Sequence, residues 1–205
     1  MPGIEIESLS PRQQTLVAKA QAAVASAQHD YALEVTGELL REVPGCVEAR
    51  RLQHAARCAG WAGRRSLGRI IRARVAMLRL MLRPPGTAVQ RLLAYERVLA
   101  VDPTFAAPLR RMADAAVEQE WPENAVFART ALRELRPRDR DNTVALGEAL
   151  IGAGRPAEAL EIAEQVLREA PSDGPALELL RHASIAKTMA EDWARTSSAV
   201  RPKIW

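Results

Sequence analysis

Apolar residues recur along this chain at fixed distances ahead of a series of prolines. Pro103, Pro137 and Pro171 are spaced by 34 residues, and Pro44 closes a stretch of the same kind. Large aliphatic residues stand eleven positions ahead (Leu33, Leu92, Val126, Leu160) and five positions ahead (Leu39, Val98, Leu132, Val166) of these prolines. Proline lacks the backbone N–H and disfavours helix in the residue before it, so each proline is expected to end a helix.

Small residues recur in the same frame. Ala20, Ala113 and Gly147 stand 24 positions ahead of a proline, and Ala32, Ala125 and Ala159 stand twelve positions ahead. Two antiparallel helices approach closely only where a small residue lies at the crossing, with larger aliphatic side chains filling the grooves around it. The composition agrees, because 48% of residues are hydrophobic but only 4% are aromatic. The sequence therefore predicts an all-α fold of helix pairs.

The repeat resembles the tetratricopeptide family. The stretch from Ala145 to Pro171, ALGEALIGAGRPAEALEIAEQVLREAP, matches best, and the stretch from Gln13 to Pro44 matches next best. The resemblance covers most of the chain and implies a right-handed α-solenoid of antiparallel helix pairs, a tetratricopeptide-like superhelix.

The expected layout is one helical-repeat domain over residues 11–192. It comprises a repeat at 11–45, an extra helix and linker at 46–65, repeats at 66–105, 106–139 and 140–173, a capping helix at 174–192 and a tail at 193–205. Ser10-Pro11 and Asp173-Gly174-Pro175 supply start signals for the first and last helices.

The array is interrupted between Pro44 and Pro103. The surplus of residues there predicts a lone helix near 47–59 and a linker, Gly60-Trp61-Ala62-Gly63. The repeat at 66–105 carries Arg79 and Arg91 where the other repeats have small residues. Since an arginine would collide with the partner helix, this repeat is either degenerate or shifted in register.

The interruption is also strongly basic. No acid occurs between Glu48 and Glu96, and eleven arginines do, although the whole chain carries a net charge of only +4. Arg65, Arg69, Arg72, Arg79 and Arg83 follow helical spacing and form a candidate partner-binding face on an amphipathic helix over residues 64–83. Three interpretations stay open: a repeat helix that buries its apolar side and solvates its arginines, docking to an acidic partner protein or a second copy, and contact with anionic lipid or nucleic acid.

The family resemblance implies a second candidate surface, the concave groove lined by first helices. In this register Arg110, Asp114 and Val117 would line it from one repeat and Val144, Glu148 and Ile151 from the next.

Other chemistry is not indicated by the sequence. The histidines and cysteines lack metal-ligand spacing, no phosphate-binding glycine loop occurs, and no nucleophile, base and orienting group assemble. We therefore expect a non-enzymatic, cytoplasmic adaptor without cofactor or metal that binds a partner protein, with self-association as a variant. The alternative is a peripheral protein that uses the basic helix on an anionic membrane or on nucleic acid.

Overall fold

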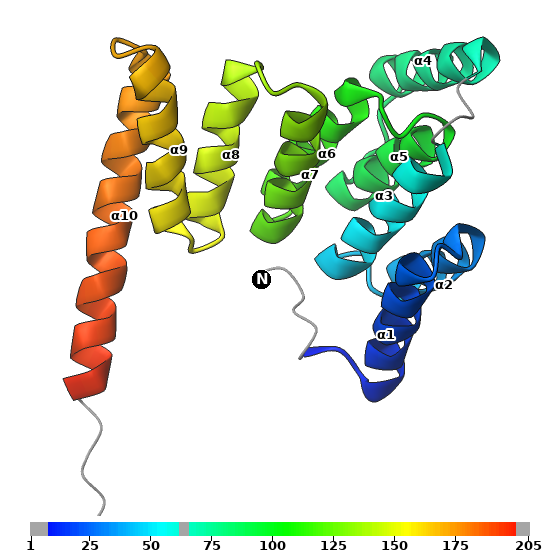
Figure 1. Cartoon of the computed structure of the whole chain (residues 1–205), viewed down its shortest axis with the longest axis horizontal. Coiled ribbons are helices and arrows are strands. Elements are labelled where there is room, and N and C mark those ends of the chain that lie inside the picture. Colours follow the sequence, from blue (N-terminus) through cyan, green and yellow to red (C-terminus); the bar gives the residue numbers. More distant parts are fainter. Residues whose placement is uncertain (1–7, 62–65, 200–205) are drawn as a thin grey trace, which may run out of the picture. The chain divides into compact units, whose positions relative to one another are not determined.

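The computed structural model describes residues 8–61 and 66–199. These residues form helices and no strand, which confirms the all-α class and its helix-pair architecture (Figure 1). The helices are α1 (Pro11–Ala25), α2 (His29–Glu42), α3 (Val47–Trp61), α4 (Leu67–Leu82), α5 (Ala88–Val101), α6 (Ala106–Glu118), α7 (Pro122–Leu135), α8 (Arg140–Gly152), α9 (Pro156–Glu169) and α10 (Gly174–Ala199).

Contacts divide the chain into two compact units, Met1–Arg136 (unit 1) and Pro137–Trp205 (unit 2), and each is described by itself. Unit 1 holds α1 to α7 and unit 2 holds α8 to α10. The single domain over residues 11–192 stays a prediction.

The prolines of the repeat end four helices in the same way. The residues that follow α2, α5, α7 and α9 directly precede proline and have φ between −142° and −130° and ψ between 73° and 95°: Val43, Asp102, Arg136 and Ala170. These are extended conformations, which the ring of a following proline favours. The local structure therefore repeats with the sequence.

Small residues lie where the pattern expects close helix contact. Ala20, Ala113, Ala32, Ala125 and Ala159 are all at most 1% exposed. Gly147 of α8 faces Leu179 of α10, and a Cβ added at Gly147 would overlap the Leu179 side chain. The glycine therefore lets the last helix approach the first helix of its unit.

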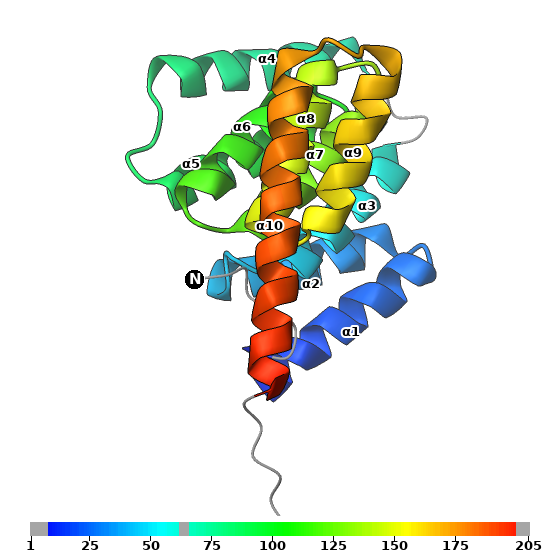
Figure 2. The same cartoon turned by 90° about the vertical axis from the view of Figure 1, so that its left-hand side faces the viewer.

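In unit 2, α8, α9 and α10 all pack against one another. Asp173 accepts a hydrogen bond of 2.9 Å from the backbone N of Ala176, so it caps α10 as predicted. The helix continues to Ala199 and extends well past α8 and α9 (Figures 1 and 2). The tail expected from residue 193 is therefore helical as far as Ala199.

In unit 1, α1, α2 and α3 pack together, and α6 packs against both α5 and α7. A buried ion pair joins these two groups. Arg50 of α3, 2% exposed, donates to Glu96 of α5 and to the side-chain carbonyl of Asn124 at the start of α7. The Asn124 amide in turn donates to the Gly45 carbonyl at 2.9 Å.

Helix α4 interrupts the array. It follows α3, which runs through Trp61, so Gly60 and Trp61 belong to a helix rather than to the expected linker, whose Ala62 and Gly63 lie outside the described residues. Helix α4 packs on α5 and lies at the edge of unit 1 in both views (Figures 1 and 2).

The register of α4 is shifted, which is why arginine is tolerated in this repeat. Ala73 and Met77 are the buried residues of α4, and Arg79 is exposed. Arg91, at the other position expected to be small, is half-buried and pairs with Glu118 of α6. Neither arginine therefore occupies a tight helix crossing.

Two glycine substitutions test the packing. Gly147→Ala is expected to lower the free energy of unfolding by about 1–3 kcal/mol, because the new methyl group meets buried Leu179. Gly37→Ala in α2 is the matched control, since no atom lies within contact distance of its added Cβ. The control should be neutral or stabilising, because alanine favours helix over glycine. Urea unfolding measures both, and an equal effect of the two changes would contradict the packing of α10 on α8.

The buried ion pair gives a second prediction. Arg50→Ala should destabilise the protein by about 3–5 kcal/mol, because it leaves the Glu96 carboxylate buried without its partner. Arg12→Ala is the control, since Arg12 is largely exposed and forms an ion pair with Glu38. Exposed ion pairs contribute about 1 kcal/mol or less to stability. If thermal unfolding shows similar losses in both variants, Arg50 does not join the two helix groups as described.

Candidate interaction surface on helix α4

An apolar stripe runs along the exposed side of α4. It comprises five large side chains at spacings of four, four, three and four residues, which are 43% to 73% exposed: Leu67, Ile71, Val75, Leu78 and Leu82. Residues at this spacing lie on one face of a helix. Contiguous exposed apolar side chains of this kind mark interaction surfaces more often than isolated ones do.

The predicted basic face lies on the same helix. Arg69, Arg72, Arg79 and Arg83, the last directly after α4, are all exposed, and Arg65 lies outside the described residues. Arg69 places its guanidinium 5.2 Å from the ring centre of Trp61, within range of a cation–π contact.

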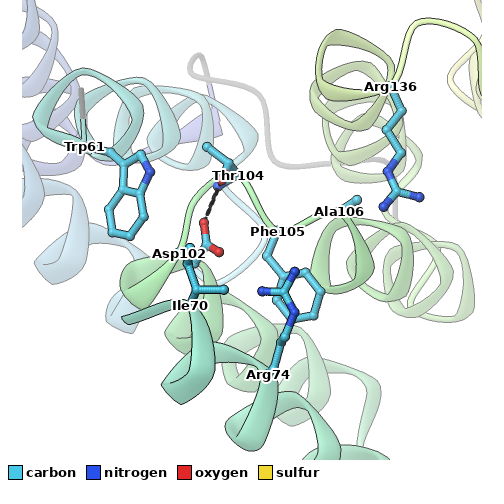
Figure 3. Close-up of a pocket in the computed structure, with 8 residues that line it drawn as sticks. All are labelled: Trp61, Ile70, Arg74, Asp102, Thr104, Phe105, Ala106 and Arg136. Atoms are coloured by element: carbon cyan, nitrogen blue, oxygen red, sulfur yellow. Dashed lines mark hydrogen bonds between the residues drawn. The ribbon is translucent and has the colours of Figure 1, made fainter. Parts of the chain in front are cut away.

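A pocket lies between α4, the end of α3 and the turn from α5 to α6 (Figure 3). Its volume is about 230 Å³. Trp61 forms one side, and Arg136 enters from the opposite side in Figure 3. The guanidinium of Arg74 lies 5.0 Å from the ring centre of Phe105. The remaining lining residues are Ile70, Asp102, Thr104 and Ala106.

A second pocket of about 310 Å³ adjoins the first, since both are lined by Phe105, Ala106 and Arg136. Its other lining residues come from α4 and the first half of α6: Met77, Met81, Ala107, Arg110 and Arg111. The two pockets together form a depression along α4, which we call the α4–α6 groove.

The charge of this groove is mainly positive. Arg74, Arg110, Arg111 and Arg136 line it, and Asp102 is the acidic residue among its lining. The Asp102 Oδ1 atom accepts hydrogen bonds from the Thr104 backbone N at 3.0 Å and from the Thr104 hydroxyl at 2.7 Å. Neither Arg74 nor Arg136 forms an ion pair with a described residue, whereas Arg111 lies 3.8 Å from Asp114. Two guanidinium groups are therefore available to an anionic ligand.

The concave-groove positions inferred from the family resemblance fall on both units. On α6, Arg110 lines the α4–α6 groove, Val117 is 61% exposed, and Asp114 accepts from Arg129 of α7 at 2.7 Å. On α8, Glu148 is exposed, Ile151 is half-buried and Val144 is buried. Their use as a binding surface stays a prediction.

The exposure of the apolar stripe disagrees with one interpretation of the arginine-rich stretch between Glu48 and Glu96. In that interpretation α4 buries its apolar side and leaves only its arginines in solvent. Most of the apolar side is exposed instead, because the register shift buries Ala73 and Met77 and turns the larger residues outward.

Two residues of the groove were not predicted from the sequence. Phe105 and Arg136 are far from α4 in sequence, and no spacing pattern connects them with that helix.

The remaining reactive side chains are buried to different degrees. Burial raises the pKa of the Cys46 and Cys58 thiols, which therefore stay protonated at neutral pH, and both cysteines are free. Burial, followed by the charge of Arg57, lowers the pKa of His54. Among the described residues, no group of three or more histidine, cysteine or acidic side chains could hold a metal ion. None of the described helices has the length and apolar character needed to span a membrane.

Comparison with protein-family models gives no match, and comparison with curated proteins gives none either. Several solved structures are similar in their helix arrangement. They include the MamA protein, at 14% identity over 89% of this chain and 86% of that chain, with a TM-score of 0.45. A tetratricopeptide repeat protein from Parabacteroides merdae is 14% identical over 91% of this chain and 64% of that chain, with a TM-score of 0.48.

A thermophilic tetratricopeptide repeat protein from Thermus thermophilus is 19% identical over 86% of this chain and 99% of that chain, with a TM-score of 0.41. The tetratricopeptide-like character of the fold rests on the chain's own helix pairs, their small residues at the crossings and their proline-terminated second helices.

Neighbouring residues of α4 test the exposure of the stripe. Met77→Ala should cost about 2–5 kcal/mol in the free energy of unfolding, because Met77 is 4% exposed and its truncation leaves a cavity. Leu78→Ala should change stability by less than about 0.5 kcal/mol, because Leu78 is 56% exposed. Both changes keep helix propensity high. Chemical denaturation that ranks the two variants in the opposite order would show that α4 packs through the stripe.

Proposed function

We propose that the protein is a non-enzymatic interaction module that holds a partner protein on the α4 surface of unit 1. The observation that carries this proposal is the apolar stripe, whose five large side chains lie in solvent along one side of a single helix. Burying exposed apolar surface is the main favourable contribution to most protein association. The basic face on the same helix adds charges that select and orient a partner.

The position of α4 also supports this proposal. The buried pair of Arg50 and Glu96 links α3 directly to α5, so α4 is not needed as a spacer between them. The described residues leave the stripe largely in solvent, and a partner that covered it would remove this apolar surface from water.

The first experiment compares matched triple variants of the tagged full chain in its own cells. Ile71→Ala, Leu78→Ala and Leu82→Ala remove stripe residues that are 54% to 73% exposed, and Leu177→Ala, Ile185→Ala and Met189→Ala remove apolar residues of α10 that are 46% to 67% exposed. Proteins that co-purify are quantified by mass spectrometry. The stripe variant should lose its partner at least about tenfold, equivalent to about 1.4 kcal/mol, whereas the control variant should keep it.

Two outcomes would contradict the proposal. One is a set of co-purifying proteins that the stripe variant leaves unchanged. The other is binding of the purified protein to phosphatidylserine vesicles or to an oligonucleotide, abolished by the stripe variant and by moderate salt, with no protein partner retained. That second result would assign α4 to a membrane or nucleic-acid surface instead.

A further inference from the structure

Trp61 carries an unpaired polar atom in the first pocket of the α4–α6 groove. The residue is 6% exposed, and its buried Nε1–H has no hydrogen-bond partner among the described residues. Figure 3 shows the indole nitrogen on the ring edge that faces Thr104 and Asp102. Buried polar groups are hydrogen-bonded in the great majority of cases, and an unpaired one costs free energy. The pocket is therefore prepared for an acceptor atom that the described residues do not supply.

The charges around the pocket favour an anionic acceptor. Arg74 and Arg136 line it, and the Arg69 guanidinium lies over the Trp61 ring. Asp102 is 4% exposed, and its Oδ1 atom is already bonded to Thr104. A carboxylate placed between the two guanidinium groups would gain charge-assisted hydrogen bonds, which are roughly twice as strong as neutral ones.

The rest of the groove favours apolar side chains. Met77 and Met81 extend the lining along α4, and Phe105 and Ala106 continue it across the start of α6. Methionine side chains adapt to varied apolar partners and are common at such binding surfaces. The second pocket therefore adds apolar lining beside its arginines, so the groove offers both apolar and cationic contacts to one ligand.

From this arrangement we propose that the α4–α6 groove binds an acidic, apolar segment of the partner protein, with a carboxylate in the Trp61 pocket and aliphatic side chains along Met77 and Met81. This inference rests on the proposed function and names the chemistry of the partner. A protein segment fits better than nucleic acid, because only the protein segment supplies both aliphatic side chains and carboxylates. The stripe beside the groove then offers further apolar contact to the same partner.

The test uses the full chain and short synthetic peptides labelled with a fluorophore. One peptide intersperses Glu and Leu, a second replaces each Glu by Lys, and a third replaces each Leu by Ser. Fluorescence anisotropy should show binding of the Glu–Leu peptide, and the other two should bind at least about tenfold more weakly. Raising the salt concentration from about 50 to about 200 mM should weaken binding of the Glu–Leu peptide, because salt screens guanidinium–carboxylate contacts.

Variants place the peptide in the groove. The double change Arg74→Gln and Arg136→Gln should lower the affinity for the Glu–Leu peptide about tenfold. Arg97→Gln with Arg168→Gln removes the same charge from exposed positions that do not line the groove and should leave binding unchanged. Trp61→Phe keeps an aromatic ring but removes the Nε1–H donor, and it should weaken binding about threefold.

Three results would overturn the inference. They are equal binding of the Glu–Leu and Lys–Leu peptides, equal effects of the groove and control double variants, and tighter binding of an oligonucleotide through the same two arginines. Co-purification of the native partner with each variant distinguishes failure of this inference from failure of the proposed function. If that partner is lost with the stripe variant but kept by the Arg74 and Arg136 double variant, the groove assignment fails while the interaction module stands.

Discussion

The buried guanidinium of Arg50 is the contact on which the arrangement of unit 1 depends. It reaches from α3 to Glu96 on α5 and to Asn124 on α7, and Asn124 also bonds the Gly45 carbonyl ahead of α3. A charge in such a position is unfavourable without its partners, so the helices that supply them must come together. Helices that are far apart in sequence are thereby joined across the insertion that separates them.

This contact explains why α4 is free to present an apolar face. A helix placed between α3 and α5 in a regular array would bury its apolar side against both. Because the Arg50 side chain links α3 directly to α5 and α7, α4 packs on α5 at the edge of the unit, and its buried residues are Ala73 and Met77. The stripe, the basic face and the α4–α6 groove all follow from that displacement. The candidate function therefore lies at the interruption of the repeat.

Much of the fold could be predicted from the sequence, because the repeat acts through local rules. Proline ends each second helix, and alanine or glycine marks each close crossing, so Pro103 and Ala125 report structure within their own repeats. The candidate site was harder to predict from the sequence. Its location was indicated by the acid-free stretch and the broken period, but the side chains that form it come from separate segments. Trp61, Arg74, Phe105 and Arg136 meet only through tertiary packing, which periodicity does not encode. The exposure of Leu78 was not predictable from the sequence either, since it follows from the shifted register of α4.

Hydrogen exchange of the full chain, measured with and without the Glu–Leu peptide, shows where a bound segment lies on the protein. If the segment binds in the α4–α6 groove, exchange should slow in α4, in the turn from Asp102 to Phe105 and in the first turns of α6, with unit 2 unchanged. Slower exchange confined to α8 and α9, or a saturated complex that leaves α4 unprotected, would contradict it.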